Sequence, residues 1–391
     1  MKKLLSILLV FMIIFFSSVR LLDGYSNSDK EGAVSNDKKE TEQKGSSSFS
    51  FVGVGDNLIH QAIWYRQEEA GQEFNFDSYY ELTNKYTQPA DVAFINSETI
   101  CAGEEFGLSH YPTFNGPTQI LDAVNSAGFD WLALSSNHTL DKGAEAVIYE
   151  LNWLKEKYPN IYVTGSHVSE KAANTCQVMN VNGIKVGILG YTYGLNGMQL
   201  PEDKPWLVDL IDKDKIQSDM EKLSKVSDIQ MVSMHWGTEY STDVNDEQKE
   251  LAKLLNEWGA EVIIGTHPHV IETAEIIHGE KQDTLCYYSL GNFLSAQDTA
   301  DRMIGGMASF TLDYDFDKKK TTFEDVKFIP TITYFNSSFT EFRTTTIHEY
   351  TDEMGATHSV TLSGDPCTKD YVVQYVKDVV GSPEGIEVVL S

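Results

Sequence analysis

Short apolar runs alternate with amphipathic windows along the chain from Phe49 onward. The runs have the length of buried strands, and the windows repeat apolar residues at three- and four-residue spacing, which is typical of helices packed on a core. Strands are expected at residues 49–54, 92–95, 131–134, 161–163, 186–189, 229–234 and 262–264, and helices at residues 76–87, 117–126, 144–158, 207–224 and 246–258. This alternation predicts an α/β fold in which helices cover a central sheet.

Two hairpin signals interrupt the alternation. Asn182-Gly183 separates the apolar runs at residues 178–181 and 184–189, and Gly279 lies within a second strand pair at residues 274–288. Beyond residue 294 the chain becomes rich in Thr, Phe and Tyr. Further strands are expected at residues 307–312, 326–332 and 339–346, and a last helix at residues 369–379. We interpret residues 301–391 as a β-rich completion of the domain at residues 49–300, with an appended β module as the alternative.

The N-terminal residues have the pattern of an export signal. Lys2 and Lys3 precede an apolar run at residues 4–16, which is short compared with the roughly 20 residues of a spanning helix. Residues 1–24 are therefore expected to be either a cleaved signal peptide or a signal-anchor. Residues 25–48 are polar and are expected to form a flexible linker. The expected location is the extracytoplasmic face of the cell membrane, or the medium if the signal is cleaved.

The charge balance restricts the partners. The chain carries 58 acidic and 30 basic residues, a formal net charge of −28. A field of this sign repels phosphate backbones, so nucleic acid is excluded as a partner, and it also disfavours binding of a long polyanion over a wide surface. A metal site can reverse the sign of the field locally.

Four cysteines permit one or two disulfides, with buried free thiols as the alternative.

Polar clusters follow five of the expected strands, at the edge where open α/β sheets place their ligands. They are Asp56 with His60, Glu98, Asn137 with His138 and Asp141, His235 with Glu239, and His267 with His269. Imidazole, carboxylate and amide donors together suit zinc, iron or manganese better than calcium. Two such ions about 3.5–4 Å apart can activate water and hold a phosphoryl group, whereas a single ion can serve structure alone.

Most of these clusters have a structural explanation when taken alone. Asp56 fits a helix N-cap, and His60 fits a helix face. Glu98 fits a solvated loop, and His138 with Asp141 fits a hydrogen-bonded turn. Packing explains the His267-Pro268-His269 segment poorly, because two histidines follow an apolar strand directly. The co-occurrence of the five clusters predicts a metal site more strongly than any one of them.

The ordered motifs resemble those of a known family. GDNLIH, NSE, SNHTLDKG, HWGTEY, GTHPHV and YSLGNF, spread over about residues 49–294, are similar to the motifs of the CapA family of poly-γ-glutamate capsule biosynthesis proteins. That family is similar in fold to calcineurin-like metallophosphoesterases. The resemblance implies a layered α/β/β/α sandwich with additional C-terminal β-strands, and a site for one or two divalent ions, Mn, Zn or Fe.

The resemblance also implies roles for individual residues. The implied metal ligands are Asp56, Glu98, Asn137, His235, His267 and His269; the implied catalytic residues are His138, Asp141 and His60; and the implied substrate-facing residues are Glu239, Ser289 and Asn292. Two positions depart from the phosphoesterase pattern. His60 follows Asp56 by four residues rather than two, and the bridging carboxylate is Glu98 rather than an aspartate.

Three functions are compatible with these residues. The first is a CapA-type capsule biosynthesis protein at the cell surface, whose partner is the capsule polymer or its synthase complex in the membrane. The second is a metal-dependent phosphoesterase or other hydrolase acting on a cell-surface substrate. The third is a metal-stabilised binding module without turnover.

Overall fold

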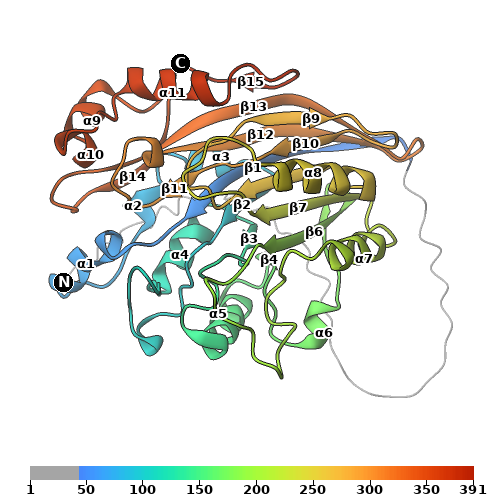
Figure 1. The fold of residues 1–391 in the computed structure, drawn as a ribbon, viewed down its shortest axis with the longest axis horizontal. Helices are drawn as coiled ribbons and strands as arrows, with labels where there is room; N and C mark the ends of the chain where they lie inside the picture. Colours follow the sequence, from blue (N-terminus) through green and yellow to red (C-terminus); the bar gives the residue numbers. More distant parts are fainter. Residues whose placement is uncertain (1–43) are drawn as a thin grey trace, which may run out of the picture. The chain divides into compact units, whose positions relative to one another are not determined.

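Two β-sheets lie at the centre of the protein, as the computed structural model of residues 44–391 shows (Figure 1). One sheet has nine strands in the order β14-β13-β12-β1-β2-β3-β4, with β11 beside β1 and β15 beside β13. The other has six strands in the order β5-β6-β7-β8-β10-β9. The strands of the first sheet are β1 (Ser46–Asn57), β2 (Val92–Asn96), β3 (Trp131–Ala133), β4 (Tyr162–Thr164), β11 (Asn292–Leu294), β12 (Ile304–Asp315), β13 (Lys320–Phe335), β14 (Phe342–Thr346) and β15 (Glu387–Val388). Those of the second are β5 (Gln177–Val181), β6 (Ile184–Thr192), β7 (Ile229–His235), β8 (Val262–Thr266), β9 (Ala274–Ile277) and β10 (Thr284–Tyr287).

The side chains of β8 show how the layers are stacked. Val262 and Ile264 belong to the large core that joins the two sheets, whereas Ile263 packs with α7 (Lys213–Leu223) and α8 (Asp246–Trp258) on the outer face. Successive side chains of a strand point to opposite faces, so β8 is covered on both. The outer face of the nine-stranded sheet carries α4 (Gln119–Ser126) and α5 (Gly143–Lys157) (Figure 1). The predicted α/β/β/α sandwich is confirmed.

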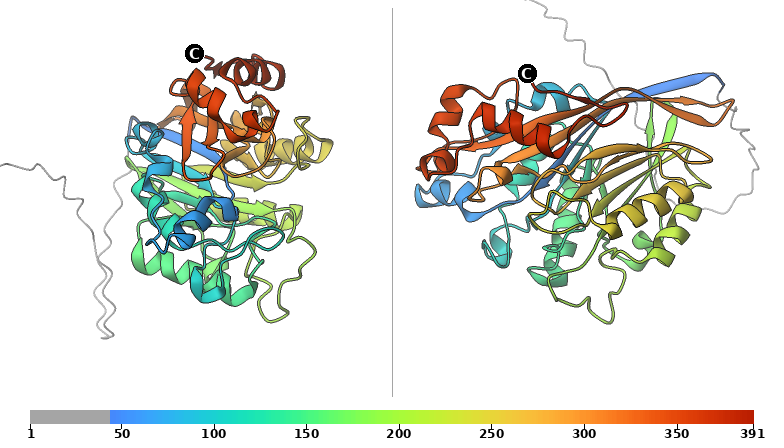
Figure 2. Two further views of the ribbon diagram at one scale, coloured as in Figure 1. Left: turned by 90° about the vertical axis from the view of Figure 1, so that its left-hand side faces the viewer. Right: turned by 45° about the horizontal axis from the view of Figure 1, so that its top comes forward.

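The C-terminal quarter of the chain completes the first sheet. β12 runs antiparallel to β1, with Phe310 opposite Phe51 and their rings stacked at 4.8 Å. Three helices, α9 (Asp352–Thr357), α10 (Ser359–Leu362) and α11 (Lys369–Val379), lie along β12 and β13 (Figure 2). His358 Nε2 lies 2.8 Å from the Thr333 carbonyl oxygen and fixes this layer to the sheet. Residues 301–391 therefore share one hydrophobic core with residues 49–300.

The remaining described helices are short. They are α1 (Gln61–Glu69), α2 (Asp77–Tyr80), α3 (Asn84–Thr87), α6 (Glu170–Ala173) and the 3₁₀ turns at Glu104–Phe106 and Asp301–Met303. None of the helices between residues 44 and 391 has the length and apolar character needed to cross a bilayer. The predicted signal or signal-anchor at residues 1–24, and most of the predicted linker at residues 25–48, lie outside the described residues.

Several boundaries differ from those expected from the sequence. The first strand begins at Ser46 rather than at residue 49, because Ser46–Ser48 pair with the end of β12. The helix expected at residues 207–224 begins only at Lys213, where Asp212 Oδ1 accepts the backbone N–H of Lys215 at 2.8 Å. The helix expected at residues 76–87 is divided into α2 and α3. All four cysteines fall within residues 44–391, and each is a free thiol.

A close backbone approach fixes the end of β1. A Cβ added to Gly55 would lie 1.9 Å from the carbonyl oxygen of Gly291, the same oxygen that accepts the N–H of Asp56 at 2.8 Å.

We expect Gly55→Ala to lower the free energy of unfolding by about 1–3 kcal/mol or more, because backbone atoms must shift. Thermal denaturation measures the effect. Gly194→Ala is the matched control, since no atom lies within 4 Å of its added Cβ; equal melting temperatures for both variants would contradict the constraint.

Candidate metal centre

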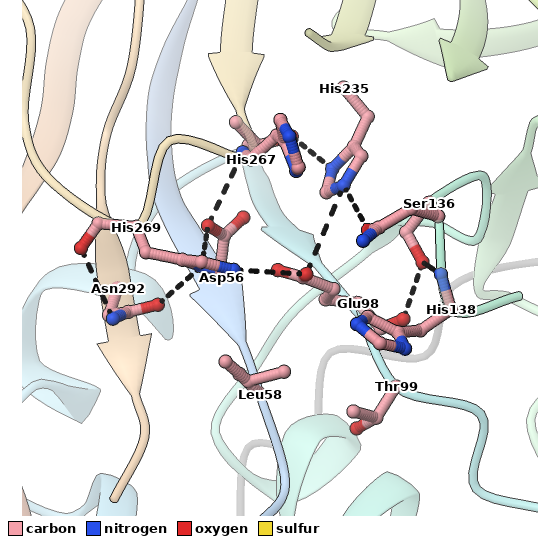
Figure 3. Close-up of polar contacts among 12 residues, drawn as sticks. Asp56, Leu58, Glu98, Thr99, Ser136, His138, His235, His267, His269 and Asn292 are labelled. Atoms are coloured by element: carbon pink, nitrogen blue, oxygen red, sulfur yellow. Dashed lines mark hydrogen bonds and ion pairs between the residues drawn. The ribbon is translucent and has the colours of Figure 1, made fainter. Parts of the chain in front are cut away.

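The strand ends of both sheets meet at one buried point (Figure 3). In the first sheet β1, β2 and β3 are parallel, and in the second β6, β7 and β8 are parallel, so each set presents its carboxyl ends together. Asp56 lies near the end of β1, Glu98 just after β2, and Asn137 after β3; His235 ends β7, and His267 follows β8. All five side chains are buried, with at most 2% of their surface exposed. Two layers therefore build one polar cluster.

The turn after β8 has an unusual backbone. His267 and His269 have φ values of 100° and 60°, a left-handed conformation that residues with side chains seldom adopt. The backbone N–H of His267 points to Asp56 Oδ2 at 3.3 Å. Strained backbone of this kind costs about 1–3 kcal/mol per residue and tends to occur at functional sites. Here it directs both imidazoles into the cluster.

Two groups of possible metal ligands share Glu98. Asp56, Glu98 and His269 form one group, and Glu98, His235 and His267 form the other; the donor atoms within each group lie within 4.8 Å of one another. His269 Nε2 is 3.5 Å and His235 Nε2 is 3.9 Å from Glu98 Oε1. Asn137 Oδ1 lies 2.9 Å from His235 Nε2, beside the second group. A further group joins the exposed Glu239 to His267 and His269.

The protonation of these groups fits a cation. Burial raises the pKa of Glu98 well above its usual range; the nearby imidazole of His269 opposes this shift, and the nearby charge of Asp56 adds to it. Burial lowers the pKa of His267 to about 3 and that of His235 well below its usual value, so both rings are neutral and keep a lone pair. Burial also acts to lower the pKa of His269, but the Glu98 carboxylate and the bond to Asp56 raise it to about 9. A proton on His269 therefore holds positive charge where a metal ion would replace it.

Buried polar atoms without hydrogen-bond partners also indicate a site for a cation. Neither carboxylate oxygen of Glu98 accepts a hydrogen bond, and His267 Nδ1 also has no partner. A buried carboxylate without a hydrogen bond is among the costliest groups in a protein interior. Divalent ions held by Asp56, Glu98, His235, His267 and His269 would pair these atoms, and the nitrogen and oxygen donors suit zinc, iron or manganese. The residues present thus fit one or two divalent ions.

Two asparagines orient the ligands. Asn292, in β11, donates through Nδ2 to the carbonyl oxygens of His269 and Arg302 at 3.2 and 3.0 Å, so its Oδ1 accepts the Nδ1 proton of His269 at 3.1 Å. This leaves His269 Nε2 facing Glu98. Asn96 Nδ2 donates to Asp56 Oδ1 at 2.8 Å. Such outer contacts fix the tautomer and orientation of metal ligands.

A cavity of about 420 Å³ opens beside the cluster. Its wall includes His138, whose Nδ1 lies 2.8 Å from Asp141 Oδ2. Asp141 Oδ2 also accepts the backbone N–H of Phe114 at 2.6 Å, which fixes the carboxylate. His60, the N-cap residue of α1, lines the same cavity, and burial lowers its pKa to about 4. The imidazole of His138 is therefore held by a carboxylate at the open side of the metal cluster.

The structure separates the expected site residues into four positions. Asp56, Glu98, Asn137, His235, His267 and His269 meet in the cluster, and His60, His138, Asp141 and Glu239 line the cavity, which Asn137 and His269 also reach. Asn292 lies behind His269. Ser289 is fully buried, its hydroxyl donating to the Val270 carbonyl oxygen at 2.8 Å, and it does not line the cavity.

Sequence reasoning missed the loop between β6 and α7. Tyr193 places its ring 4.5 Å from that of His267, and Asn196 Oδ1 accepts from Asn137 Nδ2 at 3.1 Å. Met198 of the same loop lines the cavity. Asn and Gly in this segment are ordinary turn residues, so no pattern distinguished them. Asn96 was noticed only as part of the NSE motif.

Comparison with known proteins agrees with this arrangement. The family model described as "Bacterial capsule synthesis protein PGA_cap" matches residues 50–297. The chain belongs to this family. It is 31% identical to "PGA biosynthesis protein CapA" of Bacillus subtilis (strain 168) over 189 residues, which are 48% of this chain and 47% of that protein. It is 29% identical to "Capsule biosynthesis protein CapA" of Bacillus anthracis over 184 residues, 46% of this chain and 43% of that protein. The matches thus span about half the length of these curated relatives.

Solved structures with a similar outline include two phosphatase-type proteins. The putative 5′-nucleotidase from Staphylococcus aureus has a TM-score of 0.47 at 18% identity, covering 73% of this chain and 54% of that chain. A phosphatase from Mycoplasma pneumoniae has a TM-score of 0.45 at 15% identity, covering 73% of this chain and 94% of that chain.

We expect His267→Ala and Glu98→Gln each to lower metal affinity in this PGA_cap protein by more than about 100-fold, because each removes a donor rather than an outer contact. Elemental mass spectrometry on chain purified without chelators measures bound metal. His278→Ala is the control, since that side chain is 73% exposed and pairs with Asp283. Unchanged metal content in both the His267 and the Glu98 variants would show that the cluster holds no ion.

Asn292→Ala should weaken metal binding about 10–100-fold by removing one of the two oxygens that His269 Nδ1 contacts, the other being Asp56 Oδ2 at 3.2 Å. Asn292→Asp retains an acceptor at that position and should restore much of the affinity. Calorimetric titration with manganese or zinc distinguishes the two variants. Equal losses in both would mean that packing, rather than the tautomer of His269, is what Asn292 provides.

Proposed function

We propose that this protein is a divalent-metal-dependent hydrolase that cleaves a phosphoester during capsule biosynthesis at the extracytoplasmic face of the cell membrane. One observation carries the proposal: two ligand groups share the buried Glu98, and the His138–Asp141 pair lines the cavity beside them. Membership of the capsule synthesis family supports the cellular process. The donor set favours manganese, zinc or iron.

Each side chain of the site has its own role in the proposed hydrolysis. Bound ions would supply a metal-activated hydroxide and offset charge on the phosphoryl oxygens. Asp141 accepts the Nδ1 proton of His138 and holds the ring against rotation. Nε2 of His138 is then the nitrogen that exchanges a proton with the leaving-group oxygen. Asn137 presents its amide oxygen to the cluster, while Asn196 accepts from its Nδ2 and keeps the amide from rotating.

The cellular setting is part of the proposal. We propose export and attachment through residues 1–24, with the catalytic body outside the membrane; Lys2, Lys3 and the apolar run at residues 4–16 support this proposal. The partner is then the capsule polymer or its synthase complex. The B. subtilis relative carries the name of a PGA biosynthesis protein, which supports poly-γ-glutamate as the polymer.

We expect His138→Ala to lower kcat for p-nitrophenyl phosphate about 10²–10⁴-fold while the metal content stays unchanged, since general acid catalysis contributes about that factor. Asp141→Asn should lower kcat by less and leave metal content unchanged. Turnover with added manganese or zinc, beside elemental analysis, measures both quantities. His278→Ala serves again as the control. Full activity in the His138 variant would exclude it as the general acid.

In a producing cell, the full-length His138→Ala variant should fail to restore capsule polymer to a deletion strain. Wild-type chain and the His278→Ala variant should restore it. Polymer is measured by size-exclusion chromatography of the surface extract. Normal polymer with a variant that turns over no phosphoester would show that capsule assembly uses the protein without its catalysis.

A further inference from the structure

Exposed tyrosines gather around the candidate site. In residues 44–391, five large apolar side chains are exposed: Tyr111, Tyr193, Tyr240, Val226 and Leu362. Tyr111, at 70% exposure, and Tyr240, at 43%, line the cavity, and Tyr193 stacks against the histidines of the cluster. Exposing an aromatic ring to water is unfavourable, and aromatic rings at the mouth of a cavity commonly bind ligands.

Tyr240 is held in place before any ligand arrives. Its φ is 64°, a left-handed conformation that is costly for a bulky residue, and its N–H donates to the Pro268 carbonyl oxygen at 2.7 Å. The guanidinium of Arg302 lies 3.7 Å from the ring centroid and contacts Asp298 at 3.2 Å. A stacked cation and a fixed backbone hold the ring 5.9 Å from that of His269.

Tyr111 stands on the side of the proposed general acid. Its ring is 6.4 Å from the ring of Phe114, which in turn is 4.7 Å from the imidazole of His138. The alcohol that accepts the proton from His138 must therefore leave into the part of the cavity bordered by Tyr111, Phe114 and Met198. The cavity of about 420 Å³ is large enough for a ring-sized group.

The charged groups of the cavity limit that group further. Among the described residues that line it, Asp141 and Glu239 are acidic, and none is a lysine or an arginine. A leaving group with an extra negative charge would meet repulsion from these carboxylates, because the imidazole of His269 faces Asp56 and Glu98 and the guanidinium of Arg302 is already paired with Asp298. An uncharged ring would meet aromatic faces instead.

We propose that the substrate is a phosphoester whose alcohol carries an uncharged ring, and that this ring stacks on Tyr111 and Tyr240. The inference rests on the proposed hydrolysis. In that step water loses one proton to solvent as its oxygen bonds to phosphorus, the bond from phosphorus to the alcohol oxygen breaks, and His138 gives its proton to that oxygen and takes one back from solvent. The products are a ring-bearing alcohol, which leaves through the tyrosine-lined mouth, and inorganic phosphate.

Phosphonates that cannot be hydrolysed test the ring without turnover. Calorimetric titration of the manganese-loaded full chain should give about tenfold tighter binding of phenylphosphonate than of methylphosphonate, because stacking on an aromatic side chain is commonly worth about that factor. 4-Phosphonobenzoate, with its added carboxylate, should bind more weakly than phenylphosphonate. Equal affinities of the phenyl and methyl compounds, or no binding of either at millimolar concentration, overturn the inference.

Variants assign the effect to the tyrosines. Tyr111→Ala and Tyr240→Ala should each remove most of the phenyl preference, and Tyr111→Phe should keep it. Leu362→Ala is the control, an equally exposed apolar side chain (61%) that does not line the cavity. A phenyl preference that survives both alanine variants would place the ring elsewhere.

Turnover separates this inference from the proposed function. If phenylphosphonate binds more tightly than methylphosphonate but p-nitrophenyl phosphate is not hydrolysed, the ring pocket stands and the proposed hydrolase is rejected. If p-nitrophenyl phosphate is hydrolysed but the two phosphonates bind equally, the hydrolase stands and the ring pocket is rejected. Among natural phosphoesters, a higher kcat/KM for adenosine 5′-monophosphate than for glycerol 3-phosphate identifies an aromatic base, and a higher value for glucose 1-phosphate identifies a sugar ring. Fastest turnover of the ringless glycerol 3-phosphate overturns the inference.

Discussion

The carboxylate of Glu98 is buried between the two sheets without a hydrogen bond to either oxygen, and the surrounding structure is arranged to hold it there. Asp56 adds a second negative charge close by, and the imidazoles of His235, His267 and His269 face both carboxylates. A fold gains no stability from such an arrangement, since hydrophobic residues of similar volume would cost less to bury. The cluster makes physical sense as a place where cations bind, and the strained turn at His267 and His269 is tolerated for the same reason.

The cluster depends on the packing of one sheet against the other. The first sheet supplies Asp56, Glu98 and Asn137, and the second supplies the histidines. Neither set is complete alone. One connecting segment, between β10 of the second sheet and β11 of the first, lies against both sets: a Cβ on Gly55 would meet the Gly291 carbonyl oxygen, and one on Gly265 would lie 1.8 Å from that of Tyr288. Substitutions in this seam therefore change metal ligation and folding stability together, which is why metal content and melting temperature need to be read side by side.

Much of the fold could be predicted because its strands are buried on both faces and read as continuous apolar runs. β8, at Val262–Thr266, is such a run, and the histidines after it were noticeable because they end it. Boundaries set by tertiary pairing could not be predicted. Ser46–Ser48 are polar and read as linker, yet they pair with β12. The tautomer-fixing role of Asn292 and the contribution of the loop at Tyr193 also depend on neighbours distant in sequence, so only the folded chain brings them into view.

The net charge of −28 sets a condition on the chemistry at this site. A phosphoester approaches an acidic surface and then a cavity lined by Asp141 and Glu239, with no lysine or arginine among the described residues that line it. Long-range attraction therefore cannot draw the substrate in. Favourable interactions begin only at contact, through ions held on the histidines and through stacking on Tyr111 and Tyr240. Binding of a phosphoester should thus require the ions first, and selectivity should come from the ring of the alcohol and from its lack of negative charge.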